Sequence, residues 1–176
     1  LHYPLRRQRQ MCIRDRDNMA RLFRMADFPV VCANYDVSAT VLKDLVKPYV
    51  VFERDGVKIG VLGLGCQLEG MVQANKCVGV VYNDPVTVAN EVAAVLKEKE
   101  GCDVVVCLSH LGVQYDENQL IPKTRNIDVV LGGHSHTFMK GPKTLLNMDG
   151  KNVSLMHTGK SGIYVGQMDL TLEKKK

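Results

Sequence analysis

The sequence predicts an α/β fold in which buried parallel strands present histidines at one edge of a sheet. Two continuous apolar runs, 103–108 and 127–131, have the composition of strands buried on both faces. A weaker helical segment at about 116–125 links them, and this order implies parallel neighbours joined by a right-handed crossover. Both runs end in histidine and glycine, at the strand ends where open α/β sheets bind ligands.

The composition is that of an ordinary globular protein with one domain. The chain has 176 residues, of which 45% are apolar and 24% charged. No apolar run approaches the roughly 20 residues of a membrane-spanning helix. The net charge of +4 comes largely from the first sixteen residues and the terminal run 174–176, so the body is near neutral. We therefore expect no nucleic-acid-binding face.

The cysteine pattern favours buried thiols. None of the six cysteines forms a CxxC pair, and Cys32 and Cys107 lie inside apolar runs. A disulfide framework or a thiolate metal site is therefore the weaker interpretation, and cysteine usage does not indicate a compartment.

The first sixteen residues differ from the remainder. Residues 1–16 are basic, follow no helical or strand period, and lack the apolar core of a secretory signal. The stretch 11–15 looks like translated adaptor sequence, which favours a foreign start over the alternative of a native basic arm. We predict a basic segment at 1–16, which does not belong to the domain, and a partial domain at 17–176 whose N-terminal part is missing.

A short helix and a strand begin this domain. A helical period starts at Asp17, a buried strand is predicted at 30–34, and Tyr35-Asp36 is predicted to be a polar turn. Segments 49–52 and 57–62 flank Asp-Gly and predict a hairpin. The expected apolar face of the helix contains Met19, Leu22, Phe23 and Ala26.

The strongest helix signal lies before the strand at 103–108. Asp84 is a good N-cap, Pro85 suits the first helical position, and Gly101 stands where a C-terminal glycine belongs. The predicted apolar face contains Val88, Val92, Val95 and Leu96.

The last part of the chain predicts antiparallel structure. Segments 144–148 and 153–156 flank Asp149-Gly150, which indicates a hairpin. Apolar and polar residues then alternate over 164–172, which predicts a half-buried final strand.

Two histidines follow the strand at 127–131. His134 and His136 stand one residue apart after Gly132 and Gly133, which allow a sharp turn. Imidazole is the commonest side-chain ligand for zinc, iron or manganese, and such a pair can bind one ion or two neighbouring ions. Solvated loop histidines are the alternative, but His110 occupies the same position after the preceding strand. This agreement favours a metal site.

The order of these motifs resembles a known family. Asn34-Tyr-Asp36 follows one strand, Ser109-His-Leu-Gly112 the next, and Gly132-Gly-His-Ser-His-Thr137 comes last. Together they resemble the calcineurin-like metallophosphoesterases, and most closely the 5′-nucleotidase branch with its 2′,3′-cyclic phosphodiesterase members. The resemblance extends from about residue 17 to the C-terminus. It implies a four-layer αββα sandwich with two metal ions at the strand ends.

The resemblance also implies the chemistry. His110 and His134 correspond to ligands of one divalent ion and His136 to a ligand of the other, with zinc, manganese, iron or a similar metal. The reaction implied is hydrolysis of a small phosphate ester, and of a nucleotide in particular. His157 and Asn34 are possible further site-facing residues. A structural or solvated role for His157 and a capping role for Asn34 are the alternatives.

Part of the family pattern is missing. The family's Asp-x-His, Gly-Asp and Gly-Asn-His-Glu motifs, which supply the bridging carboxylate and the leaving-group histidine, do not occur. Nor does its C-terminal nucleotidase domain. We therefore expect no catalytic residue, at most partial metal occupancy, and little or no activity from this chain alone. Family members are usually periplasmic or secreted, but no export signal is present in this sequence.

Two further hypotheses remain open. The three histidines could hold a single structural or transport zinc in a non-catalytic module. Alternatively, a degenerate domain could serve only in assembly.

Overall fold

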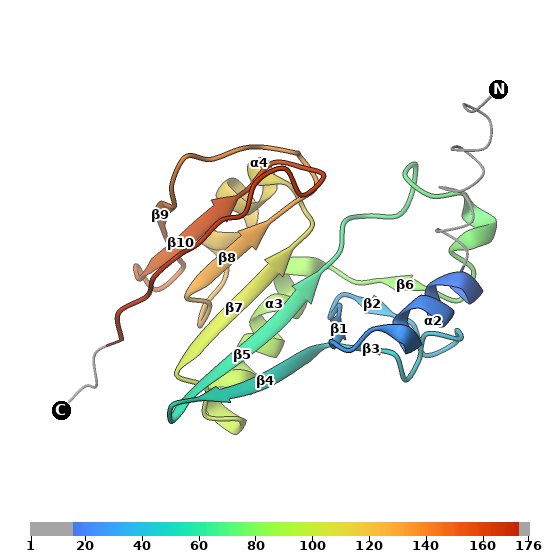
Figure 1. The fold of residues 1–176 in the computed structure, drawn as a ribbon, viewed down its shortest axis with the longest axis horizontal. Helices are drawn as coiled ribbons and strands as arrows, with labels where there is room; N and C mark the ends of the chain where they lie inside the picture. The colour runs from blue at the N-terminus through green and yellow to red at the C-terminus, as the bar shows by residue number, and fades with distance from the viewer. Residues whose placement is uncertain (1–15, 173–176) are drawn as a thin grey trace.

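A six-stranded mixed sheet dominates the computed structural model, which describes residues 16–172 (Figure 1). Its order is β4-β5-β7-β8-β10-β9, in which the four central strands are parallel and the two edge strands antiparallel to their neighbours. The α/β class predicted from the sequence is confirmed. The bounds are β4 Tyr49–Arg54, β5 Val57–Leu64, β7 Val104–Ser109, β8 Val129–Gly132, β9 Lys143–Leu146 and β10 Asn152–His157.

The predicted strand pairings are confirmed. β4 and β5 form the hairpin around Asp55 and Gly56, whose φ angles of 52° and 76° suit a tight turn. β7 and β8 are parallel neighbours, as their apolar runs indicate. β9 and β10 form the second hairpin, but β10 also pairs in parallel with β8, so the sheet continues through the histidine turn rather than changing direction there.

Helices cover one face of this sheet. α3 spans Pro85–Ala94 and continues as a wider helical turn over Val95–Lys99, while α4 at Val113–Tyr115 continues through Asp116–Leu120 and Ile121–Lys123. The Asp84 side chain caps α3 by accepting a hydrogen bond from the Thr87 amide at 2.8 Å.

The buried side of α3 differs slightly from the prediction. Ala89, Ala93 and Leu96 are fully buried, whereas Val88 and Val92 lie at the border of the core. The helix lies so close to the sheet that a Cβ atom on Gly60 would approach the Leu96 side chain to 2.8 Å. Small residues therefore face the sheet, and the valines flank them.

A smaller unit beside the sheet contains the first elements. α2 spans Arg16–Met25, β1 Val30–Val31, β2 Tyr35–Asp36, β3 Val46–Lys47 and β6 Val81–Tyr82. The helix predicted from residue 17 is confirmed, although Ala20 is buried and Leu22 is 39% exposed. The turn predicted at Tyr35-Asp36 is wrong, because these residues form a strand that pairs with β6.

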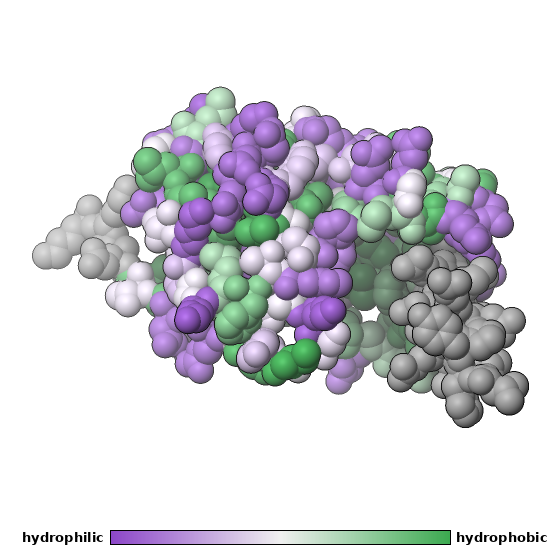
Figure 2. Space-filling view, turned by 90° about the horizontal axis from the view of Figure 1, so that it is seen from above, coloured by the Kyte–Doolittle hydropathy of each residue, from purple (hydrophilic) through white to green (hydrophobic). Residues whose placement is uncertain are grey.

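The opposite face of the sheet is more open. Leu108 and Leu131 are each 40% exposed. Seen from above, apolar side chains also reach the surface of the molecule between hydrophilic ones (Figure 2). The strand predicted at 164–172 is wrong: these residues form no strand in the described structure, and Val165 is 96% exposed. The segment lies beside Leu131 and Met156 without a neighbouring strand to complete a hydrogen-bonded ladder.

The five cysteines within residues 16–172 are free thiols, as predicted, but only Cys102 and Cys107 are buried as expected. Cys32, Cys66 and Cys77 are partly exposed, and Cys12 lies outside the described residues. Burial raises the pKa of the Cys107 thiol, which keeps it protonated and unreactive. None of the helices described has the length and apolar character needed to cross a membrane.

Candidate functional site

Two histidines meet at the C-terminal edge of the sheet. β7 and β8 pair in parallel with Ser109 opposite Gly132, so the residues that follow these strands emerge side by side. The rings of His110 and His134 lie in an edge-to-face arrangement, with centroids 5.2 Å apart and an interplanar angle of 74°. The sheet register thus brings together two side chains that are 24 positions apart in the sequence.

The backbone at the second histidine turn is strained. His134 and His136 have φ angles of 69° and 57°, in the left-handed region that non-glycine residues rarely adopt. Left-handed backbone costs roughly 1–2 kcal/mol for an L-residue with a Cβ atom. Such strain persists where the surrounding structure enforces it, and it clusters at functional sites.

Glycines provide the space around these rings. A Cβ atom on Gly133 would lie 3.1 Å from His110 Nδ1, and one on Gly112 would lie 3.4 Å from His134 Cδ2. Gly112 also has a φ of 95°, which disfavours any other residue. Both glycines therefore keep the approach of the two histidines possible.

The electrostatic setting keeps His110 neutral. Burial lowers its pKa, and the neighbouring His134 and His136 lower it further. A neutral imidazole retains a nitrogen lone pair for a metal ion. His110 borders an open cavity of about 460 Å³ that Cys32, Tyr35 and Gly133 also line.

Hydrogen bonds tie the two histidine turns together. The Gly133 amide donates to the Ser109 carbonyl at 2.8 Å, and the Val113 amide donates to Ser135 Oγ at 3.2 Å. Ser135 Oγ also lies 3.0 Å from Thr137 Oγ1. The turn that carries His134 and His136 is thus fixed to the turn that carries His110.

The donor set fits part of a metal site. Three imidazoles gather at this edge, but within the described part of the chain no three His, Cys, Asp or Glu side chains converge closely enough to hold an ion. The ligand assignment of His110, His134 and His136 therefore stays a prediction. It needs further donors to complete a coordination sphere.

The two secondary candidates have other partners. Asn34 is fully buried, and its amide exchanges two hydrogen bonds with the Gly65 backbone, at 2.7 and 2.9 Å. It joins the loop after β1 to the end of β5, in line with the structural alternative. His157 is 1% exposed and faces the helical layer, where its Nε2 lies 2.9 Å from Asp116 Oδ2.

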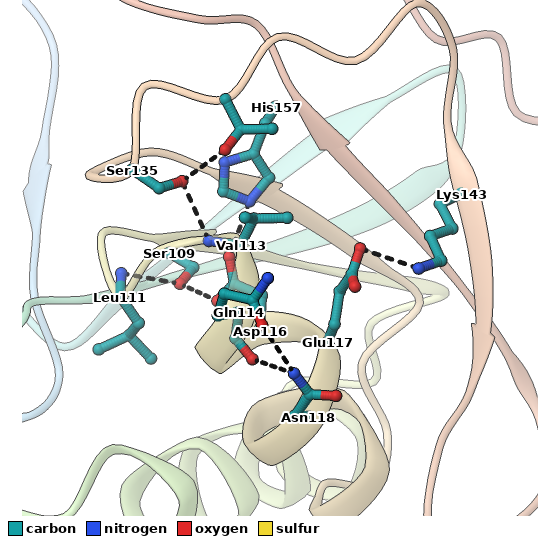
Figure 3. A network of polar contacts seen from close by, with 11 residues as sticks. Ser109, Leu111, Val113, Gln114, Asp116, Glu117, Asn118, Ser135, Lys143 and His157 are labelled. Atoms are coloured by element: carbon teal, nitrogen blue, oxygen red, sulfur yellow. Dashed lines mark hydrogen bonds and ion pairs between the residues drawn. The ribbon is translucent and has the colours of Figure 1, made fainter.

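Sequence reasoning missed Ser109 and Asp116. Figure 3 shows the Ser109 hydroxyl and the His157 ring converging on the Asp116 carboxylate, and all three residues are buried. The hydroxyl donates to Asp116 Oδ1 at 2.5 Å. One signal was available: Asp116 precedes buried Leu120 by one helical turn, which places an acid on the apolar side of the segment.

The strain at the histidine turn predicts an unusual stability order. His134→Gly should be more stable than His134→Ala by about 1 kcal/mol, because glycine adopts the left-handed conformation without penalty. Urea denaturation followed by circular dichroism measures this difference. Asn126, with a φ of 63°, is the control. Asparagine tolerates that region, so Asn126→Gly should change stability little. Equal stability of the two His134 variants would contradict the assignment of strain.

Comparisons with known proteins find nucleotide phosphoesterases. No family model matches the chain. It is 27% identical over 170 residues to the trifunctional nucleotide phosphoesterase protein YfkN of Bacillus subtilis, covering 87% of this chain and 11% of that protein. The 5′-nucleotidase precursor of Thermus thermophilus has a solved structure with a TM-score of 0.72 and 30% identity, covering 78% of this chain and 29% of that one.

A second solved structure, of the calcineurin-like phosphoesterase YfkN from Bacillus subtilis, matches with a TM-score of 0.55 and 29% identity, covering 66% of this chain and 40% of that chain. The chain spans 11% to 29% of the length of the curated relatives it matches.

Proposed function

We propose that the chain supplies the histidines of a metal-dependent phosphoesterase site. The premise is that it is homologous to 5′-nucleotidases and calcineurin-like phosphoesterases and shares the metallophosphoesterase fold. The observation that carries the proposal is the contact between the rings of His110 and His134 at the ends of adjacent strands. His134 and His136 also both have left-handed backbone in the turn that they share. The substrate proposed is a small phosphate ester, and a nucleotide in particular.

The three histidines would bind two different metal ions. His110 and His134 would hold one divalent ion, and His136 would hold a second. Imidazole ligands carry no negative charge, so they would leave the positive charge of the ions available to the phosphate. When bound, such ions neutralise phosphate oxygens and lower the pKa of a water that attacks phosphorus. The chain's own contribution is to orient the imidazoles through the turn contacts described above.

We further propose that the chain alone is inactive. The chain would contribute imidazoles only. In this family the bridging carboxylate and the leaving-group histidine come from other parts of the domain. The alternative of a single tightly held zinc has less support, because the side chains of residues 17–172 form no three-ligand cluster of His, Cys, Asp or Glu.

Complementation tests the proposal. The chain would be fused behind the N-terminal half of the metallophosphoesterase domain of a relative, and phosphate release from AMP measured with Mn²⁺ and with EDTA. We expect metal-dependent hydrolysis by the fusion and none by the chain alone. His110→Ala and His134→Ala should each lower the rate by about 100-fold or more, since losing only a hydrogen-bond partner of a metal-binding histidine already costs 10- to 100-fold.

Lys151→Ala serves as the control, because Lys151 lies in the exposed turn between β9 and β10 and should leave the rate unchanged. An active fusion that tolerates both histidine substitutions would overturn the assignment of these ligands. A fusion that folds but never hydrolyses AMP or another phosphate ester would overturn the proposed activity.

A further inference from the structure

A row of three residues crosses the end of the parallel sheet. Ser109 on β7 stands opposite Gly132 on β8, and Gly132 stands opposite His157 on β10. Residues in register across a sheet point to the same face. In this row, that face is the helical layer, because Ser109 and His157 both reach Asp116 there.

Asp116 joins the two ends of the row. Its Oδ1 accepts the Ser109 hydroxyl at 2.5 Å and its Oδ2 lies 2.9 Å from His157 Nε2. The carboxylate and both partners are between 0% and 4% exposed. A carboxylate oxygen accepts hydrogen bonds, so the contact assigns His157 Nε2 as the donor to Asp116 Oδ2.

The other ring nitrogen, His157 Nδ1, is buried without a hydrogen-bond partner among the described residues. Buried polar atoms are normally paired. The ring orientation therefore does not maximise the hydrogen bonds of His157 itself. It is the orientation that satisfies Asp116.

The middle of the row must be empty for this contact to form. A Cβ atom on Gly132 would lie 1.9 Å from His157 Nε2 and 2.2 Å from its Cε1. The imidazole therefore occupies the space in front of Gly132, at the point where the chain leaves β8 and enters the turn that carries His134 and His136.

Both ends of the network also hold the histidine turns. Ser109 Oγ accepts a hydrogen bond from the Leu111 amide at 3.2 Å, which fixes the chain on either side of His110. The His157 carbonyl accepts from the Met139 amide at 3.0 Å, just after the second turn. Through Ser109, the Asp116 carboxylate is thus connected to the start of the turn that carries His110. Through His157, it is connected to both ends of the turn that carries His134 and His136, at Gly132 and at Met139.

We propose that Asp116 is a positioning residue that sets the relative placement of His110 and His134 through Ser109 and through the His157 ring packed on Gly132. This role rests on the proposed function, since it gives the two imidazoles the placement that metal binding would need.

Nuclear magnetic resonance of the metal-free 176-residue chain tests the proposal. Ring signals of ¹⁵N-labelled histidine report tautomers, and an Overhauser contact between the His110 and His134 rings reports their placement. The wild-type chain should show this contact and a His157 ring protonated at Nε2. Asp116→Asn should abolish the contact and shift the ring signals of both histidines, because its amide hydrogens now face His157 Nε2.

The His157 variants separate positioning from packing. His157→Gln retains a donor for Asp116 and should keep the His110–His134 contact, whereas His157→Leu fills similar space without a donor and should lose it. Thr124→Val is the matched control: it deletes a buried hydroxyl that bonds the Ile121 carbonyl, and should leave the histidine signals unchanged.

Wild-type histidine signals in folded Asp116→Asn and His157→Leu would overturn the proposal. Should neither fold, Ser109→Ala decides, since it deletes one hydroxyl and leaves the contact between Asp116 and His157. It should shift the His110 ring signals, and their constancy would reject the role. Because the measurement uses no metal, it is independent of whether the proposed phosphoesterase function holds.

Discussion

Replacing Gly132 by alanine is expected to destabilise the fold by about 3–5 kcal/mol. Overpacking alone costs typically 1–3 kcal/mol, and displacing the ring also breaks a hydrogen bond to a charged group worth about 1.5–3 kcal/mol. The new methyl group would lie 1.9 Å from His157 Nε2, so the His157 ring would have to move away. Since a domain is stable by only about 5–15 kcal/mol, urea denaturation should show a markedly lower midpoint.

The same substitution elsewhere provides the control. Gly141→Ala introduces a methyl group into open space, so its effect should stay within about 0.5 kcal/mol. In a His157→Ala background the Gly132→Ala substitution should become much less harmful, because the ring that it strikes is gone. A Gly132→Ala variant as stable as the wild type would show that the ring can move at little cost.

Removing the carboxylate of Asp116 is the second change expected to have a large effect. Asp116→Ala leaves a hydroxyl and an imidazole N–H buried without their acceptor, and each buried donor left unsatisfied costs about 1–3 kcal/mol. Asp116→Asn should cost less, because its oxygen can still accept the Ser109 hydroxyl. Chemical denaturation of the variants measures both values.

The next residue in the sequence is the matched control. Glu117 forms an ion pair with Lys143 at 3.0 Å, but the Lys143 side chain is 49% exposed (Figure 3). Exposed pairs contribute about 0–1 kcal/mol, so Glu117→Ala should be nearly neutral. If Asp116→Ala and Glu117→Ala were equally stable, the burial of Asp116 would not explain its contribution to the stability of the fold.

Much of the sheet was predictable from local pattern. The apolar runs of β7 and β8, the Asp-Gly turns of both hairpins, and the Asp84 cap of α3 are signals contained within a few residues. The strand predicted at 164–172 failed for the opposite reason. Alternation makes a segment suitable for a strand, but a strand also needs a neighbour to complete its hydrogen bonds.

The candidate site was likewise predictable only in part. Histidines at two predicted strand ends were visible in the sequence as candidates, because parallel strands place their C-terminal ends along one edge. Their ring contact, the left-handed backbone of His134 and His136, and the lowered pKa of His110 depend on register and burial. No local pattern encodes these properties.

Local sequence pattern was enough to predict the strands of the two hairpins, the parallel strands β7 and β8, and the position of three histidines at strand ends, because each feature depends on residues close together in the chain. The row of Ser109, Gly132 and His157, with Asp116 packed against it, could not be predicted in this way. These residues come from three strands and a helical segment, and only the sheet register and the packing of the helix bring them together. The role of Gly132 followed from that packing, since its missing side chain matters only where an imidazole occupies the space.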